Sequence, residues 1–555
     1  MDIRKFPGLL LIILLLPLNA ACETLLLHNV RGAHIVESDI PGAKVETFPA
    51  IAFDDGKVLA LGDADKLADR YPDARKVDGR GRGLIPGLID AHGHMSALGL
   101  LQNEIDLRDR SLADTLEALE KFAARRPADS WITGRGWNQV LWPGGRWPAA
   151  SDLDALEIAQ PVWLRRIDGH AGWANTAALR AAGIDRETEA PAGGEILRDD
   201  SGRPTGILID NAMALMEKAI PAPSMEDRRA ALDAAFELAL ANGLTSVHDA
   251  GIDSETYAAY RALAAENAIP MRVYPMLMAG GGDFGKLLGR GIVGTPESRL
   301  FIRSIKVVAD GALGSRGAAM LADYRDQHGH SGLLLHSDKA LDHFYRAALE
   351  RGFQVNVHAI GDRANRQVLD KFEKYAGEAD GKTFRHRIEH AQILDPADIP
   401  RLRALGLIAS MQPVHATSDM NMAAERVGEE RLEGAYAWRT LLDGGTRIAA
   451  GSDFPVEPVN PFFGIHAAVT RRDRQGRPPG GWKPEQKMRL AEALRAFTLD
   501  AAYAAHQEEV IGNLAPGKAA DFLLLDRDIF AADPQDLWRT RVLETWVAGQ
   551  RVYAR

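Results

Sequence analysis

Short apolar runs that end in polar or charged residues recur through the middle of this chain, and each is followed by a stretch rich in alanine and leucine. The runs are GLTSVHDAG (243–251), IRSIKVVADG (302–311), FQVNVHAIGD (353–362), FRHRIEHAQ (384–392), LIASMQPVH (407–415) and RIAAGSDFP (447–455). Apolar strands that alternate with helices are typical of a parallel sheet buried on both faces. Titratable residues at the strand ends are typical of a (β/α)8 barrel, which carries its active site there. We therefore predict an α/β fold built on a TIM-like barrel.

Both ends of the chain differ from this middle region. Residues 23–84 alternate short apolar segments with glycine and aspartate turns, and residues 501–555 contain similar strand-like runs. We expect the two ends to pair into one small β-sandwich beside a barrel that spans residues 85–500. Between about residues 130 and 220 tryptophan, proline and glycine break the rhythm, so we expect an insertion over the barrel mouth.

The first 22 residues have the layout of a secretory signal peptide. Arg4 and Lys5 precede an apolar core at residues 8–18, and small residues follow it. Cys22 is the only cysteine of the chain and lies where signal peptidases cut, so it resembles the lipid-modified cysteine of bacterial lipoproteins. Asn19 stands where such lipoproteins usually have leucine, and ordinary cleavage just before Cys22 is the alternative. We expect an exported bacterial protein, either periplasmic or anchored to a membrane as a lipoprotein.

The net charge argues against a nucleic-acid partner. The chain has 66 basic and 76 acidic residues, for a formal charge of -10, and it has no basic runs. Binding of phosphate groups needs clustered lysine and arginine. We expect a small-molecule partner, and a membrane contact only through the lipid anchor. The sequence does not fix the oligomeric state.

The stretch GLIPGLIDAHGHM (83–95) ends with two histidines on either side of one glycine. Residues two apart on a strand point the same way, so His92 and His94 would form half of a metal site. Further ligand-type groups stand at the ends of later strands. In chain order the set is His92, His94, Lys306, His358, His390 and Asp453. Because strand ends converge at one face of a barrel, we expect these side chains to meet there and hold one or two divalent cations.

This ordered set resembles that of the amidohydrolase superfamily. The segments around it resemble the YtcJ-like branch of that superfamily, which includes N-substituted formamide deformylases. These segments are RIDGHAGWANTAAL, VVADGALGSRGAA, VNVHAIGDRAN, RHRIEHAQ, QPVH, GSDFPV and the terminal IGNLAPGKAADFLLLDRD. They are distributed over nearly the whole chain after residue 22. As a set they are specific for the family, and they say little about the substrate.

The resemblance implies a set of metal ligands. Carried over to this sequence, one metal would be held by His92, His94 and Asp453, and a second by His358 and His390. Imidazole and carboxylate ligands suit zinc, with manganese or iron as alternatives. In several amidohydrolases the lysine at the position of Lys306 is carboxylated and bridges two metals. The alternative is a neutral lysine, or one that is ion-paired with Asp310.

The same resemblance implies hydrolysis of a carbon–nitrogen bond other than a peptide bond. The metal would activate a water molecule as hydroxide and polarise the scissile carbonyl of an amide or N-formyl group. Asp453 would take the proton from that water and deliver it to the leaving amine. An esterase or lactonase is the alternative among enzymes. A surface-binding lipoprotein without catalysis is the alternative outside them.

Polar and aromatic residues outside this set are candidates for contacts with the substrate. His170 could reach the substrate carbonyl as a catalytic group, or it could be a structural hydrogen-bonding residue. His415 could orient the substrate or bind metal weakly. Trp137, together with Trp142 and Trp147, could line an aromatic wall, although large residues in an insertion usually pack.

Two further pairs are expected to support the site rather than to react. His248 and Asp249, at the end of what we expect to be the third strand, are interpreted as structural. Arg387 and Glu389 stand beside His390 in the sequence. We expect them to form a buried ion pair that supports this neighbouring metal ligand.

Overall fold

The computed structural model describes residues 23–36, 43–101, 104–108, 110–139, 142–166, 171–191, 194–210, 212–314, 316–377 and 381–555. The expected leader with Cys22, and the candidate His170, lie outside the described residues. No helix in the described ranges is both long and apolar enough to cross a lipid bilayer.

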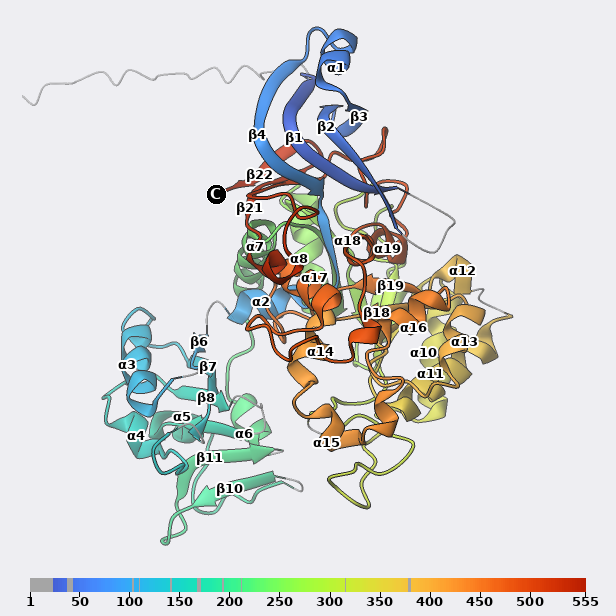
Figure 1. Cartoon of the computed structure of the whole chain (residues 1–555). Coiled ribbons are helices and arrows are strands. Elements are labelled where there is room, and N and C mark those ends of the chain that lie inside the picture. Colours follow the sequence, from blue (N-terminus) through green and yellow to red (C-terminus); the bar gives the residue numbers. More distant parts are fainter. Residues whose placement is uncertain are drawn as a thin grey trace, which may run out of the picture.

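A parallel barrel stands at the centre of the molecule (Figure 1). Its strands are β5 (Leu88–Gly93), β12 (Leu244–Ile252), β13 (Arg272–Val273), β14 (Met276–Met278), β15 (Ser304–Val308), β16 (Gln354–Ala359), β17 (Arg387–His390), β18 (Ile408–Met411) and β19 (Arg447–Ala450). The short β13 and β14 both pair with β12 and together make one barrel strand. A parallel bridge between Gly93 and Phe454 brings the segment after β19 back to β5, so the eight-stranded barrel is nearly closed. The predicted TIM-like barrel is confirmed.

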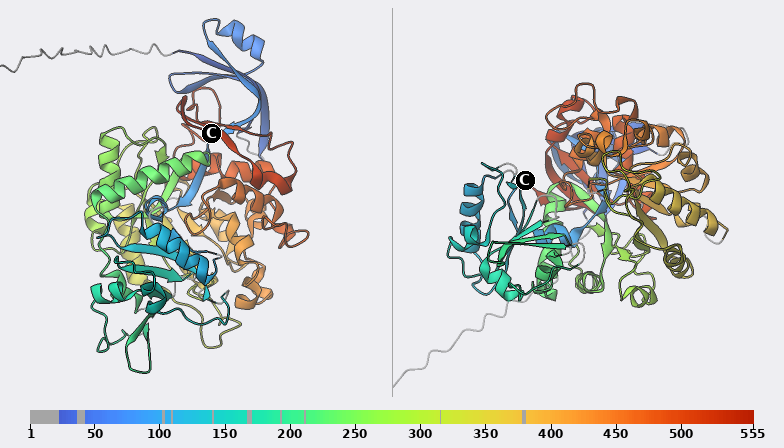
Figure 2. Two further views of the ribbon diagram at one scale, coloured as in Figure 1. Left: turned by 90° about the vertical axis from the view of Figure 1, so that its left-hand side faces the viewer. Right: turned by 90° about the horizontal axis from the view of Figure 1, so that it is seen from below.

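Helices surround the strands on the outside (Figure 2). They are α7 (Met225–Ala241), α8 (Ser254–Ala265), α9 (Phe284–Gly289), α10 (Asp338–Leu349), α11 (Asp362–Tyr375), α12 (Gly381–Phe384), α13 (Ile399–Ala404), α16 (Trp438–Asp443), α17 (Pro461–Thr470), α18 (Leu490–Ala496) and α19 (Leu499–Ala504). Helix α10 shows why such segments are helical. The hydroxyl of Ser337 caps its first turn, and Leu341, Phe344, Tyr345 and Ala348 recur at helical spacing and are buried.

Shorter helices lie in the connecting loops. They are α2 (Met95–Leu101), α14 (Pro413–Asp419), α15 (Ala423–Val427), and the 3-10 turns η2 (Glu430–Leu432), η3 (Pro484–Gln486) and η4 (Pro534–Arg539). Helices α2 and α14 directly follow β5 and β18, so they lie at the carboxyl ends of the strands. This is the end at which a barrel of this type builds its site.

The two ends of the chain pair with each other, as expected, but in one seven-stranded sheet where a β-sandwich was predicted. It contains β1 (Leu25–Val36), β2 (Lys44–Asp54), β3 (Lys57–Gly62), β4 (Arg75–Pro86), β20 (Phe522–Leu525), β21 (Val542–Val547) and β22 (Gln550–Ala554), with α1 (Ala64–Arg70) beside it. The ends meet where β4 pairs antiparallel with β20. A buried ion pair of 3.0 Å between Arg272 and Asp521 joins this sheet to the barrel.

A second module is inserted between β5 and β12 and lies to one side of the barrel in Figure 1 and in the right-hand view of Figure 2. It comprises β6 (Ile105–Asp106), α3 (Leu112–Ala123), β7 (Ile132–Trp137), α4 (Ala150–Asp154), β8 (Val162–Arg166), β9 (Ala171–Ala174), α5 (Thr176–Ala181), β10 (Gly194–Arg198), β11 (Pro204–Asp210) and α6 (Met213–Glu217). Its sheet begins at Ile105, well before residue 130. The reason is that β6, α3 and β7 form a parallel β–α–β unit, which in the sequence is indistinguishable from a barrel repeat.

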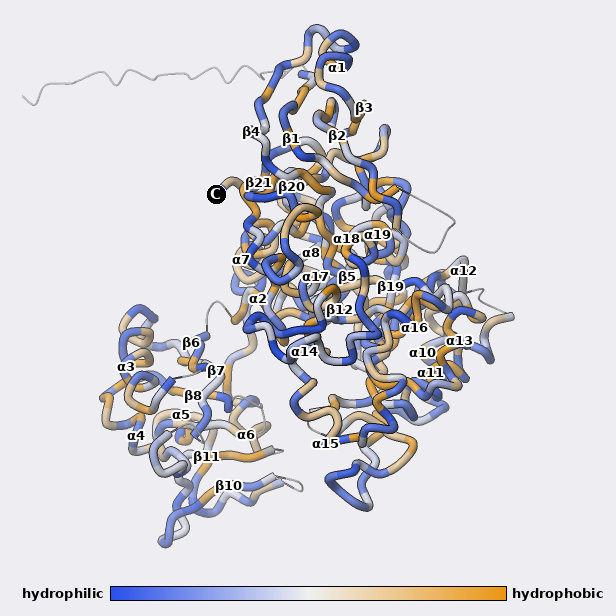
Figure 3. Tube along the Cα trace, viewed as in Figure 1, coloured by the Kyte–Doolittle hydropathy of each residue, from blue (hydrophilic) through white to orange (hydrophobic). Residues whose placement is uncertain are grey.

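The hydrophobic segments of the chain coincide with its buried elements. Figure 3 shows apolar stretches in β11 and around β5 and β12, and hydrophilic stretches along the outer loops. The barrel strand β5 is buried at every position. An apolar interior fixes the strands, so the polar side chains at their carboxyl ends are held by rigid elements.

Candidate metal centre

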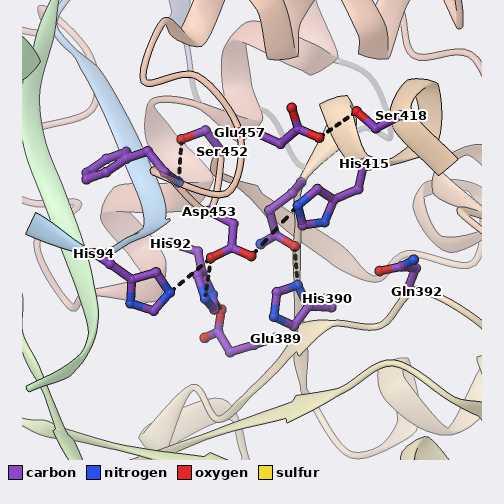
Figure 4. A network of polar contacts seen from close by, with 12 residues as sticks. His92, His94, Glu389, His390, Gln392, His415, Ser418, Ser452, Asp453 and Glu457 are labelled. Atoms are coloured by element: carbon purple, nitrogen blue, oxygen red, sulfur yellow. Dashed lines mark hydrogen bonds and ion pairs between the residues drawn. The ribbon is translucent and has the colours of Figure 1, made fainter. Parts of the chain in front are cut away.

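Histidines from the ends of β5 and β17 and from helix α14 meet Asp453, which follows β19, at the carboxyl end of the barrel (Figure 4). Two groups of three have ligand atoms within 4.8 Å of one another: His92, His94 and Asp453, and His390, His415 and Asp453. Asp453 belongs to both groups. Its Oδ1 lies 3.0 Å from Nε2 of His94, and its Oδ2 lies 3.7 Å from Nε2 of His415. The two groups are therefore two halves of one centre that share a carboxylate.

Left-handed backbone conformations aim two of these side chains. His390 has φ 74° and Asp453 has φ 61°, a region that residues other than glycine rarely adopt. Neighbouring side chains of a regular strand point to opposite faces. Glu389 and His390 are neighbours at the end of β17, yet both lie at the centre, and the turn of the backbone at His390 explains this. Strain of this kind is typical of functional sites.

His92 is held from both sides of its ring. Its Nδ1 lies 2.5 Å from Oε2 of Glu389, and its Nε2 lies 3.0 Å from Nζ of Lys306. A carboxylate only accepts hydrogen bonds and an ammonium only donates them, so Nδ1 carries the proton and Nε2 presents its lone pair. Arg387 forms an ion pair of 3.0 Å with the other oxygen of Glu389 and donates to Nδ1 of His248 at 2.8 Å.

His390 is held by a neutral group instead. Its Nδ1 donates to Oε1 of Gln412 at 2.7 Å, which leaves Nε2 as the free lone pair. The ring of His358 packs at 4.4 Å from that of His390. The Nε2 atoms of His358 and His415 are buried and have no hydrogen-bond partner among the described residues. Buried polar atoms are nearly always satisfied, so these two point to a missing partner.

Burial sets the charge of these groups. It lowers the pKa of His92 to about 4 and that of His358 to about 3, and it lowers the pKa of His390 well below its ordinary value. Burial alone would raise the pKa of Asp453, but the hydrogen bond with His94 and the neighbouring imidazoles outweigh it and hold that pKa below the usual range. At neutral pH, His92, His358 and His390 are therefore neutral and the carboxylate of Asp453 is ionised.

This donor set fits a divalent cation. Neutral imidazole nitrogen and carboxylate oxygen are the ligands that zinc takes in proteins, and the unpartnered Nε2 atoms would be satisfied by such an ion. When bound, a cation of this kind supplies Lewis-acid chemistry, which polarises a carbonyl and makes water more acidic. Burial lowers the pKa of Lys306 to about 8, and an ammonium group at its position would repel a cation held by His92.

Comparison with known proteins agrees with this chemistry. Residues 75–553 match the Amidohydrolase family. The chain belongs to the amidohydrolase family. It is 34% identical over 515 residues to the protein YtcJ of Bacillus subtilis strain 168, covering 91% of this chain and 96% of that one. It is 29% identical over 527 residues to an N-substituted formamide deformylase of Arthrobacter pascens, covering 91% and 95%.

A solved structure is similar over the same length. The uncharacterized metal-dependent hydrolase from Pyrococcus horikoshii OT3 has a TM-score of 0.76 and 26% identity, covering 92% of this chain and 99% of that one. The family resemblance predicted from the sequence motifs is confirmed. The protein is a metal-dependent hydrolase of the amidohydrolase superfamily.

Several of the ligands expected from the sequence lie close to one another in the structure. His390 forms one group of three with His415 and Asp453, and the ring of His358 lies 4.4 Å from that of His390. Lys306 contacts His92, whereas the carboxylate of Asp310 accepts hydrogen bonds from backbone N–H groups. The alternative in which Lys306 pairs with Asp310 is therefore not what the structure shows.

Other expectations need correction for reasons of packing. Trp137 is fully buried in the inserted module, where its Nε1 donates to the carbonyl of Leu164 at 2.7 Å, so it is a core residue and not a substrate wall. Glu389 does pair with Arg387, but its second oxygen holds His92 on a distant strand rather than its neighbour His390.

The strand that carries His248 and Asp249 also has a different place. β12 pairs directly with β5, so it is the second barrel strand and not the third. Both residues are fully buried, and the contacts of Asp249 agree with the structural role interpreted from the sequence. Asp249 accepts a hydrogen bond from the backbone N–H of Met95 and another from the hydroxyl of Tyr260, and it thereby fixes the start of α2.

Two supporting residues escaped the sequence analysis. Gln412 holds His390, and its only signal is its place at the end of an apolar run. Asp90 stands two residues before His92 and accepts from the backbone N–H of His92 and from both the backbone and the hydroxyl of Ser452. This carboxylate links the first strand to the segment that carries Asp453.

Proposed function

We propose that this amidohydrolase cleaves the carbon–nitrogen bond of an amide or N-formyl compound. The observation that carries the proposal is the Asp453 carboxylate, which lies between two groups of imidazoles and belongs to both. A carboxylate in that place can exchange a proton with a water molecule and with a leaving nitrogen. The likeness to the N-substituted formamide deformylase of Arthrobacter pascens supports the same type of bond.

Each step of the reaction needs a different protonation state of Asp453. The ionised carboxylate first accepts a proton as the water oxygen bonds to the carbonyl carbon. An amide nitrogen is a poor leaving group until it is protonated, so the carboxyl group then returns the proton to nitrogen as the C–N bond breaks. The products are a carboxylic acid and an amine. His94, which is 3.0 Å from Asp453 and about one-third exposed, lies on the open side where substrate would enter.

We propose zinc as the metal, with manganese and iron as alternatives. Four imidazoles and one carboxylate contact one another at the centre, and this nitrogen-rich donor set favours zinc over magnesium or calcium, which prefer oxygen ligands. Elemental analysis of the protein as isolated tests the metal. Magnesium or calcium as the resident ion would contradict the proposal.

A matched panel of substrates tests the reaction. N-formyl amines and simple amides are assayed beside esters and lactones that carry the same acyl group, with zinc or manganese present. We expect hydrolysis of at least one amide or N-formyl compound, its loss after chelation, and its return when the metal is added back. Hydrolysis of esters or lactones alone would assign the protein to that alternative. Full activity in demetallated protein would overturn a metal-dependent mechanism.

A further inference from the structure

We infer that the two halves of the centre bind divalent cations with different affinities, because the histidine of one half is backed by a carboxylate and that of the other by an amide. The inference rests on the proposed metal-dependent function. The His92 half consists of His92, His94 and Oδ1 of Asp453. The His390 half consists of His390, His415 and Oδ2 of Asp453. Glu389 and Gln412 are the positioning residues that set the difference.

In the His92 half, the imidazole of His92 is hydrogen-bonded to an anion. Glu389 is fully buried, and its Oε2 lies 2.5 Å from Nδ1 of His92. A hydrogen bond to a buried carboxylate is short and strong, and it shifts electron density in the imidazole toward the free nitrogen. Arg387 pairs with the opposite oxygen, Oε1, so it orients Glu389 and leaves Oε2 facing His92. His92 is therefore the more basic ligand.

The His390 half has a neutral group in the same place. The Nε2 of Gln412 donates to the carbonyl of Ser410 at 3.2 Å, so its Oε1 must face Nδ1 of His390, at 2.7 Å. An amide oxygen carries a partial charge only, and it polarises the ring less than a carboxylate does. His390 is positioned as firmly as His92, but it donates less electron density from its free nitrogen.

The remaining groups are the same in the wild type and in the variants compared below. Asp453 contributes one oxygen to each half, and each half has a second histidine. Lys306 lies beside Nε2 of His92 and opposes a cation there while it is protonated. That cost is present in the wild type and in each variant compared below, so the comparison between them isolates the backing groups.

The test is titration of the chelator-treated protein with Zn²⁺, in competition with a chromophoric chelator and with metal content measured after dialysis. We expect two classes of sites in the wild type. Glu389→Gln should weaken the tight class by about 10- to 100-fold and leave the weak class nearly unchanged. Gln412→Glu should strengthen the weak class, which misfolding cannot do. Ser418→Ala, a change on α14 away from both backing groups, should leave both classes unaltered.

Three results would overturn the inference and leave the proposed function standing. Two classes of equal affinity, an equal loss in both classes for Glu389→Gln, or no gain for Gln412→Glu would each do so. If only one class of site is detected, the inference is supported when Glu389→Gln weakens that site. The inference is contradicted when only Gln412→Glu changes that site. A wild-type protein that binds no metal would instead overturn the proposed function. If Glu389→Gln does not fold, because Arg387 loses its partner, Gln412→Glu decides alone.

Discussion

Asp453 is the residue on which the proposed chemistry depends. Asp453→Asn keeps the shape of the side chain and removes its capacity to take a proton, so we expect hydrolysis to fall by about 100-fold or more. Glu457→Gln is a matched control, because Glu457 is a partly buried carboxyl near His415 that bonds to Ser418. The measurement is the turnover number of each variant with its metal content. Unchanged turnover in Asp453→Asn would remove this residue from proton transfer.

The charge of Lys306 decides whether both halves of the centre can hold a metal ion at the same time. Carboxylation would turn its cationic side chain into an anion able to bridge two metals, whereas an ammonium group would oppose the second one. We expect Lys306→Ala to lose at least one metal per chain and most of its activity, and added acetate or propionate to restore part of both. Metal analysis with and without the carboxylate makes the measurement. Unchanged stoichiometry and activity would show that Lys306 is a structural strand residue.

The ligand types at the centre follow from the sequence, but their partners do not. His92, His94, His390 and Asp453 stand at the ends of apolar runs, and strand ends of a parallel barrel must converge. Glu389 contacts His92, which is 297 positions away in the chain. That contact depends on which strands face each other across the barrel and on the left-handed backbone of His390, and neither has a signal in local sequence.

Helices α10 and α11 are joined by a cluster of charges around one carboxylate. Hydrogen bonds from Lys374, and also from Lys371 and Tyr375, lower the pKa of Asp342 from its ordinary 3.8 to about 2. A carboxyl group with a lowered pKa stabilises the fold fully above the ordinary value, and this contribution is lost as the pH falls toward the folded value.

The pH dependence of this cluster's contribution to stability is therefore confined to the acid range. Asp342→Asn should lower the free energy of unfolding by at most about 1 kcal/mol near neutral pH, because the group is partly exposed. The difference from the wild type should shrink between pH 4 and pH 2, a range set by the ordinary and folded pKa values of 3.8 and about 2. Urea unfolding at several pH values measures it. A difference that does not depend on pH would mean that the charge of Asp342 is not what joins the helices.

Two features of the inserted module, its first residue and the environment of Trp137, cannot be predicted from the sequence. Its first unit, β6–α3–β7, has the same apolar period as a barrel repeat, so no boundary at Ile105 can be predicted from the sequence. The burial of Trp137 depends on Trp142 and Trp173, which pack their rings 6.1 Å from it. The neighbours of a tryptophan in the fold cannot be derived from composition. A tryptophan that lines a substrate site and one that packs in a core therefore look the same in the sequence.

Because Trp137 is a core residue, we expect its substitution to change stability and not substrate binding. Trp137→Ala should destabilise the inserted module by about 3–5 kcal/mol, because it leaves a cavity and an unpaired carbonyl at Leu164. Thermal unfolding and limited proteolysis measure the change. Metal content should stay at the wild-type value, because the metal centre lies on the barrel strands. A variant of normal stability with a raised KM would return Trp137 to the substrate site.

At the scale of the whole molecule, the sheet made by the two chain ends lies at the top of Figure 1, and the metal centre lies at the carboxyl ends of the barrel strands. The chain is fastened to that sheet from Glu23 onward, where Glu23 pairs with Arg75 and Thr24 donates to Asp54 at 2.6 Å. A lipid on Cys22 would thus join the membrane directly to the sheet. The carboxyl end of the barrel would then face away from the bilayer, open to small molecules.

The proposed anchor predicts the chemistry of the mature amino terminus. Expressed in a bacterium with its leader, the protein should begin at Cys22 and carry acyl chains on it, and it should sediment with membranes. Mass spectrometry of the terminal peptide measures this directly. Cys22→Ser is the matched control, since it removes the only thiol in the chain and should leave the protein unmodified but active. A wild-type protein that is exported with a free terminus at or after Cys22 would contradict the lipid anchor and leave export standing. Retention of residues 1–22 in the mature protein would contradict a cleaved signal peptide and, with it, the lipid anchor on Cys22.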